Sequence, residues 1–404
     1  MSAPLVSIRR YVTSIKDGTH GTHERVPDGI PLLSAKNIQD GAIVMGLEES
    51  RITPDEYWGI HRSGYLAAGD VLLTIVGTIG RTAVYDGQAM VAFQRSVASL
   101  RPASHCHGRF LFYCLSSTLV QEQLSAAAHQ SAQSGVYLGD VAMIEVPLLP
   151  LATQRAIADY LDRRTARIDA LIAAKRRMVE LFDERLEARR EDLIWTQHGV
   201  ELRRALRRAC ALIKDGTHQP PQRVESGYPL LSVRNLDNGC LSLRDDDSMV
   251  TEADYIQLTK SWKIEPGDVA LAIVGATLGK VGMVGDLPPV AIQRSVAILR
   301  PRSSMAISRF LYHAIATRSF QAVLWSNVAF SAQPGVYLGA VAALEIPLPP
   351  LEDQRGTAAE LDSAEERTAQ LASAETRQVA LLQERRQALI TAAVTGQLEI
   401  PDAA

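Results

Sequence analysis

The motif Ile-Lys-Asp-Gly-Thr-His at residues 15–20 is repeated without change at residues 213–218. Further along, Gly-Asp-Val-x-Leu-x-Ile-Val-Gly begins at Gly69 and again at Gly267, with the same separation between copies. Matches in the same order over such a length indicate a tandem duplication. The repeat is far too long for a solenoid, so each copy is at least one complete domain.

Each copy contains two kinds of sequence. Short apolar runs, such as residues 71–76 and 269–274, end at glycine, which is typical of buried strands joined by turns. Proline clusters follow at residues 147–150 and 347–350. After each cluster comes a proline-free stretch rich in Ala, Leu, Glu, Arg and Gln, which are strong helix formers. A mixed α/β domain followed by a long helix is therefore expected twice.

The helical stretches cover about residues 153–198 and 352–395, and Gly199 and Gly396 are expected to end them in the left-handed conformation. Apolar residues recur along both at coiled-coil spacing. A helix of this length cannot bury such a stripe against a small domain, so we expect the two helices to pair. The predicted seam comprises Ile157, Leu161, Ile168, Leu171, Met178 and Phe182 in the first helix and Leu361, Leu371, Leu382 and Leu389 in the second.

The predicted fold class is α+β, with two duplicated mixed α/β domains separated by two long helices. These helices are expected to form an antiparallel coiled coil, which relates the domains by a pseudo-two-fold axis. The domains are placed at residues 1–150 and 200–350. The helices are placed at residues 151–199 and 351–404, the second range including the C-terminal tail.

Composition excludes several classes of protein. With 404 residues, 47% of them apolar, the chain is too apolar to be disordered, and it has no apolar run long enough to span a membrane. We see no signal peptide, and the four cysteines are irregularly spaced, so a cytoplasmic location is expected. The net charge of −3 gives no sign of a strongly basic nucleic-acid binder. Any case for nucleic-acid binding must rest on motifs.

No enzyme signature is found. Residues 275–280 resemble a phosphate-binding loop, but the loop has three residues between its glycines instead of four, and Val281 follows the lysine. His105 and His107 flank Cys106, yet three adjacent residues do not converge on a metal without further ligands. We therefore predict no catalytic residue, no metal site and no cofactor in this chain.

The junctions carry a family resemblance. Residues 147–162 read Pro-Leu-Leu-Pro-Leu-Ala-Thr-Gln-Arg-Ala-Ile-Ala-Asp-Tyr-Leu-Asp, residues 347–355 open the second helix in a similar way, and residues 384–396 end it with Glu-Arg-Arg-Gln-Ala-Leu-Ile-Thr-Ala-Ala-Val-Thr-Gly. With the repeated Leu-Leu-Ser-x-Lys/Arg-Asn and Gly-Asp-Val-x-Leu motifs, the whole chain closely resembles the specificity (S) subunit of type I restriction–modification systems.

The resemblance implies a non-catalytic subunit that binds double-stranded DNA. Each duplicated domain would be a target-recognition domain for one half of a bipartite site, and the helices would set the gap between the halves. Methyltransferase (M) subunits would supply chemistry with S-adenosylmethionine, and restriction/translocase (R) subunits would use ATP and Mg²⁺. The alternative is a protein-interaction scaffold that carries two ligand-binding domains on a coiled coil and binds no DNA.

Polar residues of the repeated motifs are the candidate DNA contacts, because amide, cationic and hydroxyl groups on turns can reach bases or phosphates. The same side chains could instead stabilise the fold. Tyr137 and Tyr337 are expected in the core, with stacking as the alternative. The loops that differ between the copies, residues 20–24 against 218–222 and 127–130 against 328–330, are expected to carry specificity. The candidates are Lys16, Thr19, His20, Lys36, Asn37, Arg81, Gln94 and Arg95 in the first copy and Lys214, Thr217, His218, Arg234, Asn235, Lys280, Gln293 and Arg294 in the second.

Overall fold

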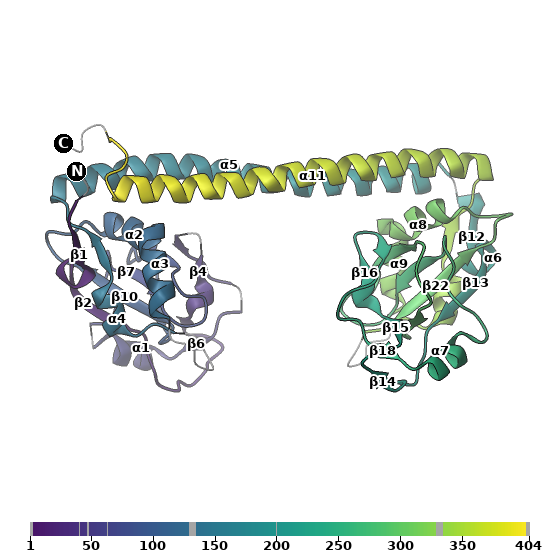
Figure 1. Ribbon diagram of the computed structural model, residues 1–404, viewed down its shortest axis with the longest axis horizontal. Coiled ribbons are helices and arrows are strands. Elements are labelled where there is room, and N and C mark those ends of the chain that lie inside the picture. The colour runs from purple at the N-terminus through teal and green to yellow at the C-terminus, as the bar shows by residue number, and fades with distance from the viewer. Residues whose placement is uncertain are drawn as a thin grey trace. The chain divides into compact units, whose positions relative to one another are not determined.

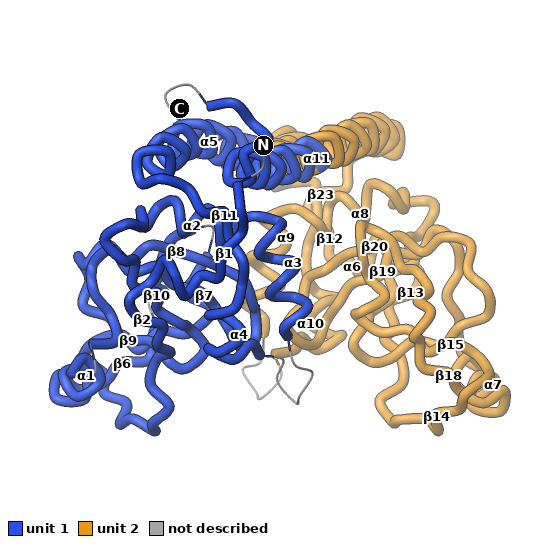
Figure 2. The backbone as a smooth tube through the Cα atoms, turned by 60° about the vertical axis from the view of Figure 1, so that its left-hand side comes forward, with its two compact units in different colours: residues 1–176, 377–404 blue, residues 177–376 orange. Residues whose placement is uncertain are grey.

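The computed structural model describes residues 3–39, 41–46, 48–62, 64–128, 135–198, 200–328 and 334–400. The chain divides into two compact units, which Figure 2 shows in different colours. Unit 1 comprises Met1–Arg176 and Arg377–Ala404, and unit 2 comprises Arg177–Thr376. Each unit holds one sequence repeat together with part of each long helix. The predicted loops at 127–130 and 328–330 lie largely outside the described residues.

Unit 1 is a mixed α/β domain (Figure 1). Its strands are β1 (Leu5–Ser7), β2 (Val12–Asp17), β3 (Ile30–Leu33), β4 (Ile38–Gln39), β5 (Ala42–Ile43), β6 (Arg51–Ile52), β7 (Val71–Thr74), β8 (Thr82–Val84), β9 (Ala92–Phe93), β10 (Val97–Pro102) and β11 (Glu145–Pro147). Its own helices are α1 (Pro54–His61), α2 (Gly108–Ser116), α3 (Thr118–Ala127) and α4 (Leu138–Met143), with the 3-10 turns η1 (Ile8–Arg10) and η2 (Ala35–Asn37). The central sheet has the order β2-β10-β7-β8, and β6-β3-β9 form a second sheet.

Unit 2 repeats this arrangement. Its strands are β12 (Arg203–Ala205), β13 (Cys210–Asp215), β14 (Arg223–Val224), β15 (Tyr228–Leu231), β16 (Leu236–Asp237), β17 (Cys240–Leu241), β18 (Met249–Val250), β19 (Val269–Ala272), β20 (Val281–Val284), β21 (Ala291–Ile292), β22 (Val296–Pro301) and β23 (Glu345–Pro347). Its helices are α6 (Leu206–Ala209), α7 (Glu252–Thr259), α8 (Ser308–Ala316), α9 (Arg318–Ser326) and α10 (Leu338–Ala343), with short turns η3 (Asp192–Thr196), η4 (Val200–Leu202) and η5 (Val233–Asn235). The main sheet has the order β13-β22-β19-β20-β17-β16.

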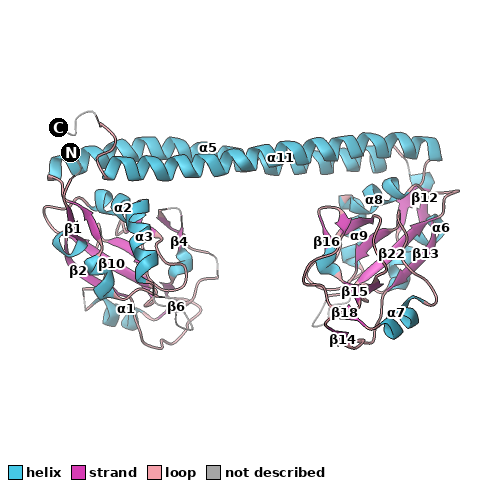
Figure 3. Ribbon diagram, viewed as in Figure 1, coloured by secondary structure: helices cyan, strands magenta, loops and turns pink. Residues whose placement is uncertain are grey.

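The central sheet of unit 1 is buried on both faces, which explains the continuous apolar run at its middle. Val71 and Leu73 point to the core that also contains Phe110 of α2. Leu72, between them, points to a second core with Leu33 and Phe93. Because successive side chains of a strand face opposite ways, a strand covered on both sides needs apolar residues at every position. Figure 3 shows α2 covering one face of the sheet.

Two long helices, α5 (Leu151–Glu191) and α11 (Leu351–Val394), pack against each other in unit 1 and are joined in unit 2 by the Arg189–Glu360 ion pair. In unit 1, Leu161 shares a core cluster with Ile390, while the later Ile168 shares one with the earlier Val379. Residue numbers therefore rise along one helix as they fall along the other. The predicted antiparallel pairing is confirmed, and the unit boundary falls inside both helices.

Three residues of the predicted seam do not lie on it. The exposed fractions of Leu171, Met178 and Leu371 are 46%, 40% and 50%. Ile172 and Val379 are buried instead. A residue one position before the seam is turned away from it by about 100°, because an α-helix has 3.6 residues per turn. The prediction counted strict heptads from Ile157, which gives Leu171 and Met178, whereas the buried Thr165 and Ile172 belong to a heptad series that starts one residue later, at Ala158. The other seam residues are buried or partly buried: Ile157, Leu161, Ile168, Phe182, Leu361, Leu382 and Leu389.

The ends of the long helices follow the expected chemistry. Each begins directly after a proline cluster, and α11 is followed by Gly396, whose φ of 75° is left-handed as predicted. Gly199, expected to end the first helix, lies outside the described residues. Among the helices that the structure describes, none is long and apolar enough to cross a membrane.

Candidate nucleic-acid interface

Two motifs that are far apart in the sequence meet at one end of the central sheet of unit 1. The backbone N–H of Thr19 donates to the carbonyl of Phe93 (2.8 Å), and the N–H of Arg95 donates to the carbonyl of Thr19 (3.0 Å). The Ile-Lys-Asp-Gly-Thr-His turn after β2 is thereby fixed to the Gln-Arg-Ser turn before β10. Gln94 in turn donates its N–H to Leu33 (2.8 Å), which brings the end of β3 to the same place.

The row of hydrogen bonds continues across the sheet. Ile75 donates its N–H to the carbonyl of Ser96 (2.9 Å), and Val136 donates to the carbonyl of Ile75 (2.9 Å). Unit 2 repeats the row, with Arg294 bound to Thr217 at 3.1 Å. We call this row the turn edge. It comprises residues 17–20, 94–96 and 135–137 in unit 1 and residues 215–218, 293–295 and 335–337 in unit 2.

Glycine in the repeated turn is required by a close approach of two backbones. A Cβ atom on Gly18 would lie 2.1 Å from the carbonyl oxygen of Phe93, and one on Gly216 would lie 1.9 Å from that of Ile292. These distances are far below van der Waals contact, so no other residue fits without moving the turn. The glycine therefore explains how the turn sits so close to the neighbouring strand.

Arginine and glutamine occupy equivalent places on the turn edge of each unit. Arg95 and Arg294 are exposed, and among the described residues their side chains have no hydrogen-bond or ion-pair partner. Gln94 and Gln293 precede them and are half-buried. An exposed guanidinium on a rigid turn can bind a phosphate, or both acceptors of a guanine. Within each unit, the structure thus brings the predicted glutamine and arginine together with the neighbouring turn.

The histidines and threonines of the same turns mainly stabilise the turns themselves. His20 Nε2 lies 2.6 Å from Asp17 Oδ2, and His218 Nε2 lies 2.9 Å from Asp215 Oδ2. Thr217 donates its hydroxyl to the carbonyl of Gln219 (2.7 Å). Thr19 Oγ1 accepts the backbone N–H of Gly21 (3.2 Å) and contacts His23 Nε2 (2.6 Å). Both histidine rings remain largely exposed, so they can still meet a ligand.

Asn37 and Asn235 hold the fold, which overturns their predicted role in base contacts. Asn37 is 2% exposed, accepts the N–H of Ser34 (3.0 Å) and donates to the carbonyl of Val44 (2.9 Å). Asn235 is 1% exposed and makes the same bonds to Ser232 and Ser242. Both ends of each amide are used inside the domain, so neither amide is free to reach a base. The Asn side chain caps a 3-10 turn in each unit.

The cations before these asparagines are paired with carboxylates. Lys36 Nζ lies 3.0 Å from Glu49, and a guanidinium nitrogen of Arg234 lies 2.8 Å from Asp246. The pKa of Glu49 is lowered, first because the backbone of Gly46 donates to it and next because of Lys36. Pairing reduces the charge that these two cations offer to a phosphate.

The remaining predicted cations lie beside the turns. Arg81 and Lys280 are exposed just after the glycine turns that follow β7 and β19. One guanidinium nitrogen of Arg81 donates to the carbonyl of Ile38 (3.4 Å). Lys16 is half-buried on β2, whereas Lys214 is exposed at the equivalent position of β13. All four remain candidates for phosphate contacts.

Tyr137 and Tyr337 were expected in the core, and the structure contradicts this. They are 69% and 78% exposed, and both lie on the turn edge. The preceding valine is buried in the core instead, since Val136 and Val336 are each only 3% exposed. The repeated Gly-Val-Tyr-Leu-Gly motif marked the site in the sequence, but hydrophobic character alone assigned the tyrosine to the wrong side.

Comparison with known protein families identifies the fold. A sequence model of the Type I restriction modification DNA specificity domain matches residues 34–181 and 222–380. Each match begins after the Ile-Lys-Asp-Gly-Thr-His turn, and covers the rest of one repeat and most of the helix that follows it. The protein belongs to this family. As a DNA specificity protein of a type I restriction–modification system it has the known role of its family, recognition of a DNA sequence, and the family is non-catalytic.

Two curated relatives from Escherichia coli support the assignment. The type I restriction enzyme EcoBI specificity subunit is 22% identical over 358 residues, which cover 81% of this chain and 71% of the relative. The EcoKI specificity subunit of strain K12 is 20% identical over 347 residues, which cover 81% of this chain and 73% of the relative.

A solved structure has the same fold. It is described as the "structural basis underlying complex assembly and conformational transition of the type I R-M system". Its chain is 19% identical to this one, with a TM-score of 0.72 over 98% of both chains. The predicted architecture of two duplicated domains and two long helices is therefore shared with a member of a type I system.

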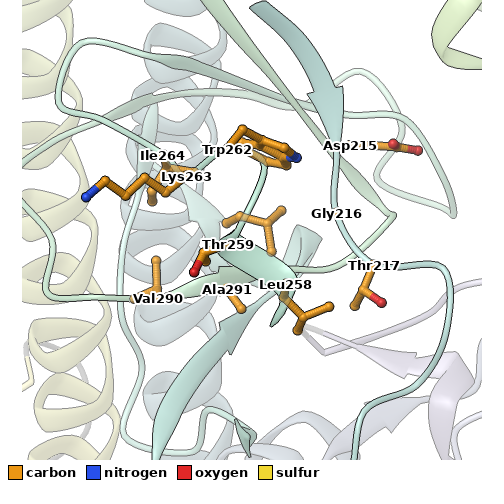
Figure 4. A pocket seen from close by; sticks show the side chains of 11 residues that line it. Asp215, Gly216, Thr217, Leu258, Thr259, Trp262, Lys263, Ile264, Val290 and Ala291 are labelled. Atoms are coloured by element: carbon orange, nitrogen blue, oxygen red, sulfur yellow. The ribbon is translucent and has the colours of Figure 1, made fainter. Parts of the chain in front are cut away.

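A small cavity lies beside the turn edge of unit 2 (Figure 4). Its volume is about 130 Å³, and its lining includes Asp215, Thr217, Trp262 and Lys263. Sites for small organic ligands have volumes of about 300–1,000 Å³. This cavity is therefore large enough for a few water molecules but too small for a nucleoside.

A cluster of charged groups joins α8 to the long helices within unit 2. His313, Asp362 and Glu365 each offer a ligand atom within 4.8 Å of the others, which makes them candidate metal ligands among the described residues. However, Arg309 Nε donates to Asp362 (2.8 Å), and Arg190 pairs with Glu365. Two guanidinium groups already neutralise both carboxylates, so we assign the cluster to the fold and not to a metal.

The proton on His313 is fixed by the same neighbours. Arg190 Nε must donate, so His313 Nδ1 accepts its hydrogen bond (3.2 Å), and His313 Nε2–H donates to Asp362 (2.7 Å). The side chain is fully buried. Burial lowers the pKa of His313 to about 4, although the carboxylate of Asp362 opposes this. The imidazole is neutral at pH 7.

Proposed function

We propose that the turn edge of each unit is the surface that contacts the DNA target, with one unit for each half of a bipartite site. The carrying observation is an exposed arginine that both units present at the same position, Arg95 and Arg294, and that has no side-chain partner among the described residues. The neighbouring turn is fixed by backbone hydrogen bonds, so the guanidinium is held on a rigid support. Rigid placement favours binding because little order has to be gained in the complex.

The proposal extends to the assembly that the family implies. The long helices set the gap between the half-sites and bind M subunits, which methylate adenine with S-adenosylmethionine. R subunits join the complex and use ATP and Mg²⁺. This chain carries no cofactor of its own and acts on DNA in the cytoplasm. The support for these statements is membership of the family and the antiparallel pairing of the long helices in unit 1.

The test is the affinity of the full chain for DNA after removal of both arginines. The double variant Arg95→Ala and Arg294→Ala is expected to bind a duplex carrying its target at least about 30-fold more weakly, since each good arginine contact to a base contributes about 1–3 kcal/mol and two are removed. If both arginines bind phosphates instead, the dependence of log affinity on log salt falls by about 2. Anisotropy titrations at several salt concentrations measure both quantities.

The chain offers a matched control. Arg10 and Arg208 are exposed and also occupy equivalent positions in the two repeats. They precede β2 and β13, at the opposite end of these strands from the turn edge. The double variant Arg10→Ala and Arg208→Ala removes the same charge and is expected to bind DNA as the unchanged chain does. Equal loss in both double variants would mean that net charge, and not the turn edge, determines binding.

A further inference from the structure

The two tyrosines of the turn edge differ from every other tyrosine in the chain. All eleven tyrosines lie in the described residues. Six are buried and three are partly buried, so Tyr137 and Tyr337 alone are exposed. Single exposed apolar residues need no explanation. An explanation is needed here, because two aromatic rings are exposed at equivalent positions of a duplicated domain and each copy also keeps the surrounding motif.

Both rings are held on a fixed backbone. In unit 1, Val136 donates to Ile75 (2.9 Å), and the carbonyl of Tyr137 accepts the N–H of Val141 (3.0 Å). The tyrosine is thus bound to the sheet on one side and to α4 on the other. It is the residue before the first helical turn, with extended φ and ψ of −77° and 150°. Tyr337 has the same position before α10, at −70° and 143°.

The rings lie on the same hydrogen-bonded row as the exposed arginines. Starting from Thr19, the hydrogen-bonded row passes through Ser96 and Ile75 to Val136. Three steps between neighbouring strands place Tyr137 about 15 Å from the Thr19 turn, at 4.7–4.9 Å per step. That separation corresponds to about four base pairs of a duplex at 3.4 Å each. A ligand that lies along the turn edge therefore meets Arg95 and then the tyrosine.

We propose that Tyr137 and Tyr337 stack on nucleobases, one ring in each half-site, where a base has left the helix. The inference rests on the proposed function of the turn edge. A methyltransferase has to rotate its target base out of the duplex, which leaves a gap in the base stack. An exposed aromatic ring on a fixed backbone, on the same edge as an exposed arginine, fits such a gap, because every base offers a face for stacking. The phenol hydroxyl is not needed for this contact.

The experiment uses the full chain and a duplex that already contains the gap. The target is first identified by mapping methylated adenines in the host genome. Two probes then carry an abasic site in place of the methylated adenine, one in each half-site. The unchanged chain is expected to bind either abasic probe about tenfold more tightly than the intact duplex, which corresponds to stacking of one base. Fluorescence anisotropy measures the affinities.

Single variants separate the two rings. Tyr137→Ala is expected to lose the preference for one abasic probe only, and Tyr337→Ala for the other only. Tyr137→Phe and Tyr337→Phe keep the preference, because they retain the ring. If the tyrosines only stabilised the fold, their removal would not abolish the preference for one abasic probe while leaving the other unchanged. Met143→Ala is the matched control, since Met143 is 67% exposed at the far end of the same helix α4 and should change neither probe.

The remaining outcomes distinguish failure of the proposed function from failure of the stacking inference. If the unchanged chain shows no binding to its mapped target, the proposed function fails and the inference fails with it. If it binds but the alanine variants keep their preference for both abasic probes, the inference alone fails. If the alanine variants bind DNA normally but lose association with methyltransferase subunits, the rings contact protein instead. Because both rings are exposed, thermal unfolding of the variants should match that of the unchanged chain.

Discussion

At the scale of single residues, a buried glycine decides where the recognition turn lies. Gly18 has no room for a Cβ atom, because the carbonyl of Phe93 lies 2.1 Å from the place where it would be. Gly139 in α4 has no atom within 4 Å of that place. Replacing glycine by alanine at these two positions therefore separates the cost of a steric clash from the general effect of losing a glycine.

Gly18→Ala is expected to lower the free energy of unfolding by about 1–3 kcal/mol, the usual cost of forcing a methyl group into a packed site. It should also weaken DNA binding, because the turn carries Thr19 and His20. Gly139→Ala is expected to be neutral or to stabilise the chain by up to about 1 kcal/mol, since alanine favours helix. Urea unfolding and anisotropy titrations measure these effects. Equal destabilisation by both changes would contradict the prediction.

His313 gives a prediction for pH. Burial lowers its pKa to about 4 in the folded chain, and Arg190 and Arg309 act in the same direction, while Asp362 and Glu365 oppose the shift. The pKa of histidine in the unfolded chain is about 6.5. Between pH 6.5 and 4, His313 therefore binds a proton in the unfolded state but not in the folded state. The stability from this residue is complete above pH 6.5 and falls as the pH drops from 6.5 to 4. The expected loss is about 3 kcal/mol.

The measurement follows tryptophan fluorescence during urea unfolding at pH 7, 5.5 and 4.5. Three of the four tryptophans, Trp195, Trp262 and Trp325, lie in unit 2, so the signal reports mainly on the unit that contains His313. His313→Gln can keep both hydrogen bonds without titrating and should show a shallower fall with pH. The exposed His105 is the control, and His105→Gln should retain the slope of the unchanged chain. A slope that stays the same in His313→Gln would refute the assignment.

At the scale of elements, the seam between the helices shows that the contribution of a leucine to stability depends on whether it is buried. Leu361 is completely buried in unit 2, whereas Leu371, ten residues later on the same helix, is 50% exposed. Leu361→Ala is expected to cost about 2–5 kcal/mol, as do other leucines removed from a core. Leu371→Ala should change the free energy of unfolding by less than about 0.5 kcal/mol. Chemical denaturation of both variants decides whether the seam runs as described.

The same comparison shows how far the sequence could predict the elements. The duplicated domains, the buried strands and the paired helices were predictable, because they follow from repeats, apolar runs and helix propensity. The exact seam was not, since polar or small residues such as Thr165 and Ala372 are at least partly buried at positions where leucine was sought. Heptad counting from Ile157 gives Leu171, and the buried Ile172 follows only when the count starts at Ala158.

The candidate site was only partly predictable for a related reason. Repeated motifs identified the turns correctly, but a motif does not reveal which way a side chain points. Asn37 and Arg95 were equally plausible DNA contacts in the sequence, yet one is buried as a cap and the other is exposed. Tyr137 was assigned to the core because aromatic residues usually are, and only the three-dimensional arrangement shows it at the surface.

At the scale of the whole molecule, the two junctions between domain and helices keep one contact and differ in the rest. Arg109 pairs with Asp162 in unit 1 as Arg309 pairs with Asp362 in unit 2. The neighbouring Tyr113 of unit 1 is replaced by His313 in unit 2. Each domain is thus fixed to the long helices by an arginine–aspartate pair, with different packing around it. The shared attachment is consistent with helices that act as a common frame for both domains.

If that frame sets the gap in the target, a change of helix length must change the gap alone. Deleting residues 173–179 and 372–378 removes seven residues from each helix, which is one heptad, so the remaining seam positions keep their register. Each helix shortens by about 10 Å. The mapped target is therefore expected to lose about three base pairs from its gap, at 3.4 Å per base pair. Both half-sites should stay unchanged, because the turn edges are untouched.

Methylated adenines mapped in cells that carry the shortened chain measure the gap and the half-sites together. A chain shortened in one helix only is the control, since its seam residues no longer match and it should methylate poorly. An altered half-site would show that the helices contribute to base recognition, and an unaltered gap would show that they do not set the spacing. Either result would contradict the proposal that the helices only set the gap between the half-sites. The proposal that the turn edge contacts DNA would be unaffected.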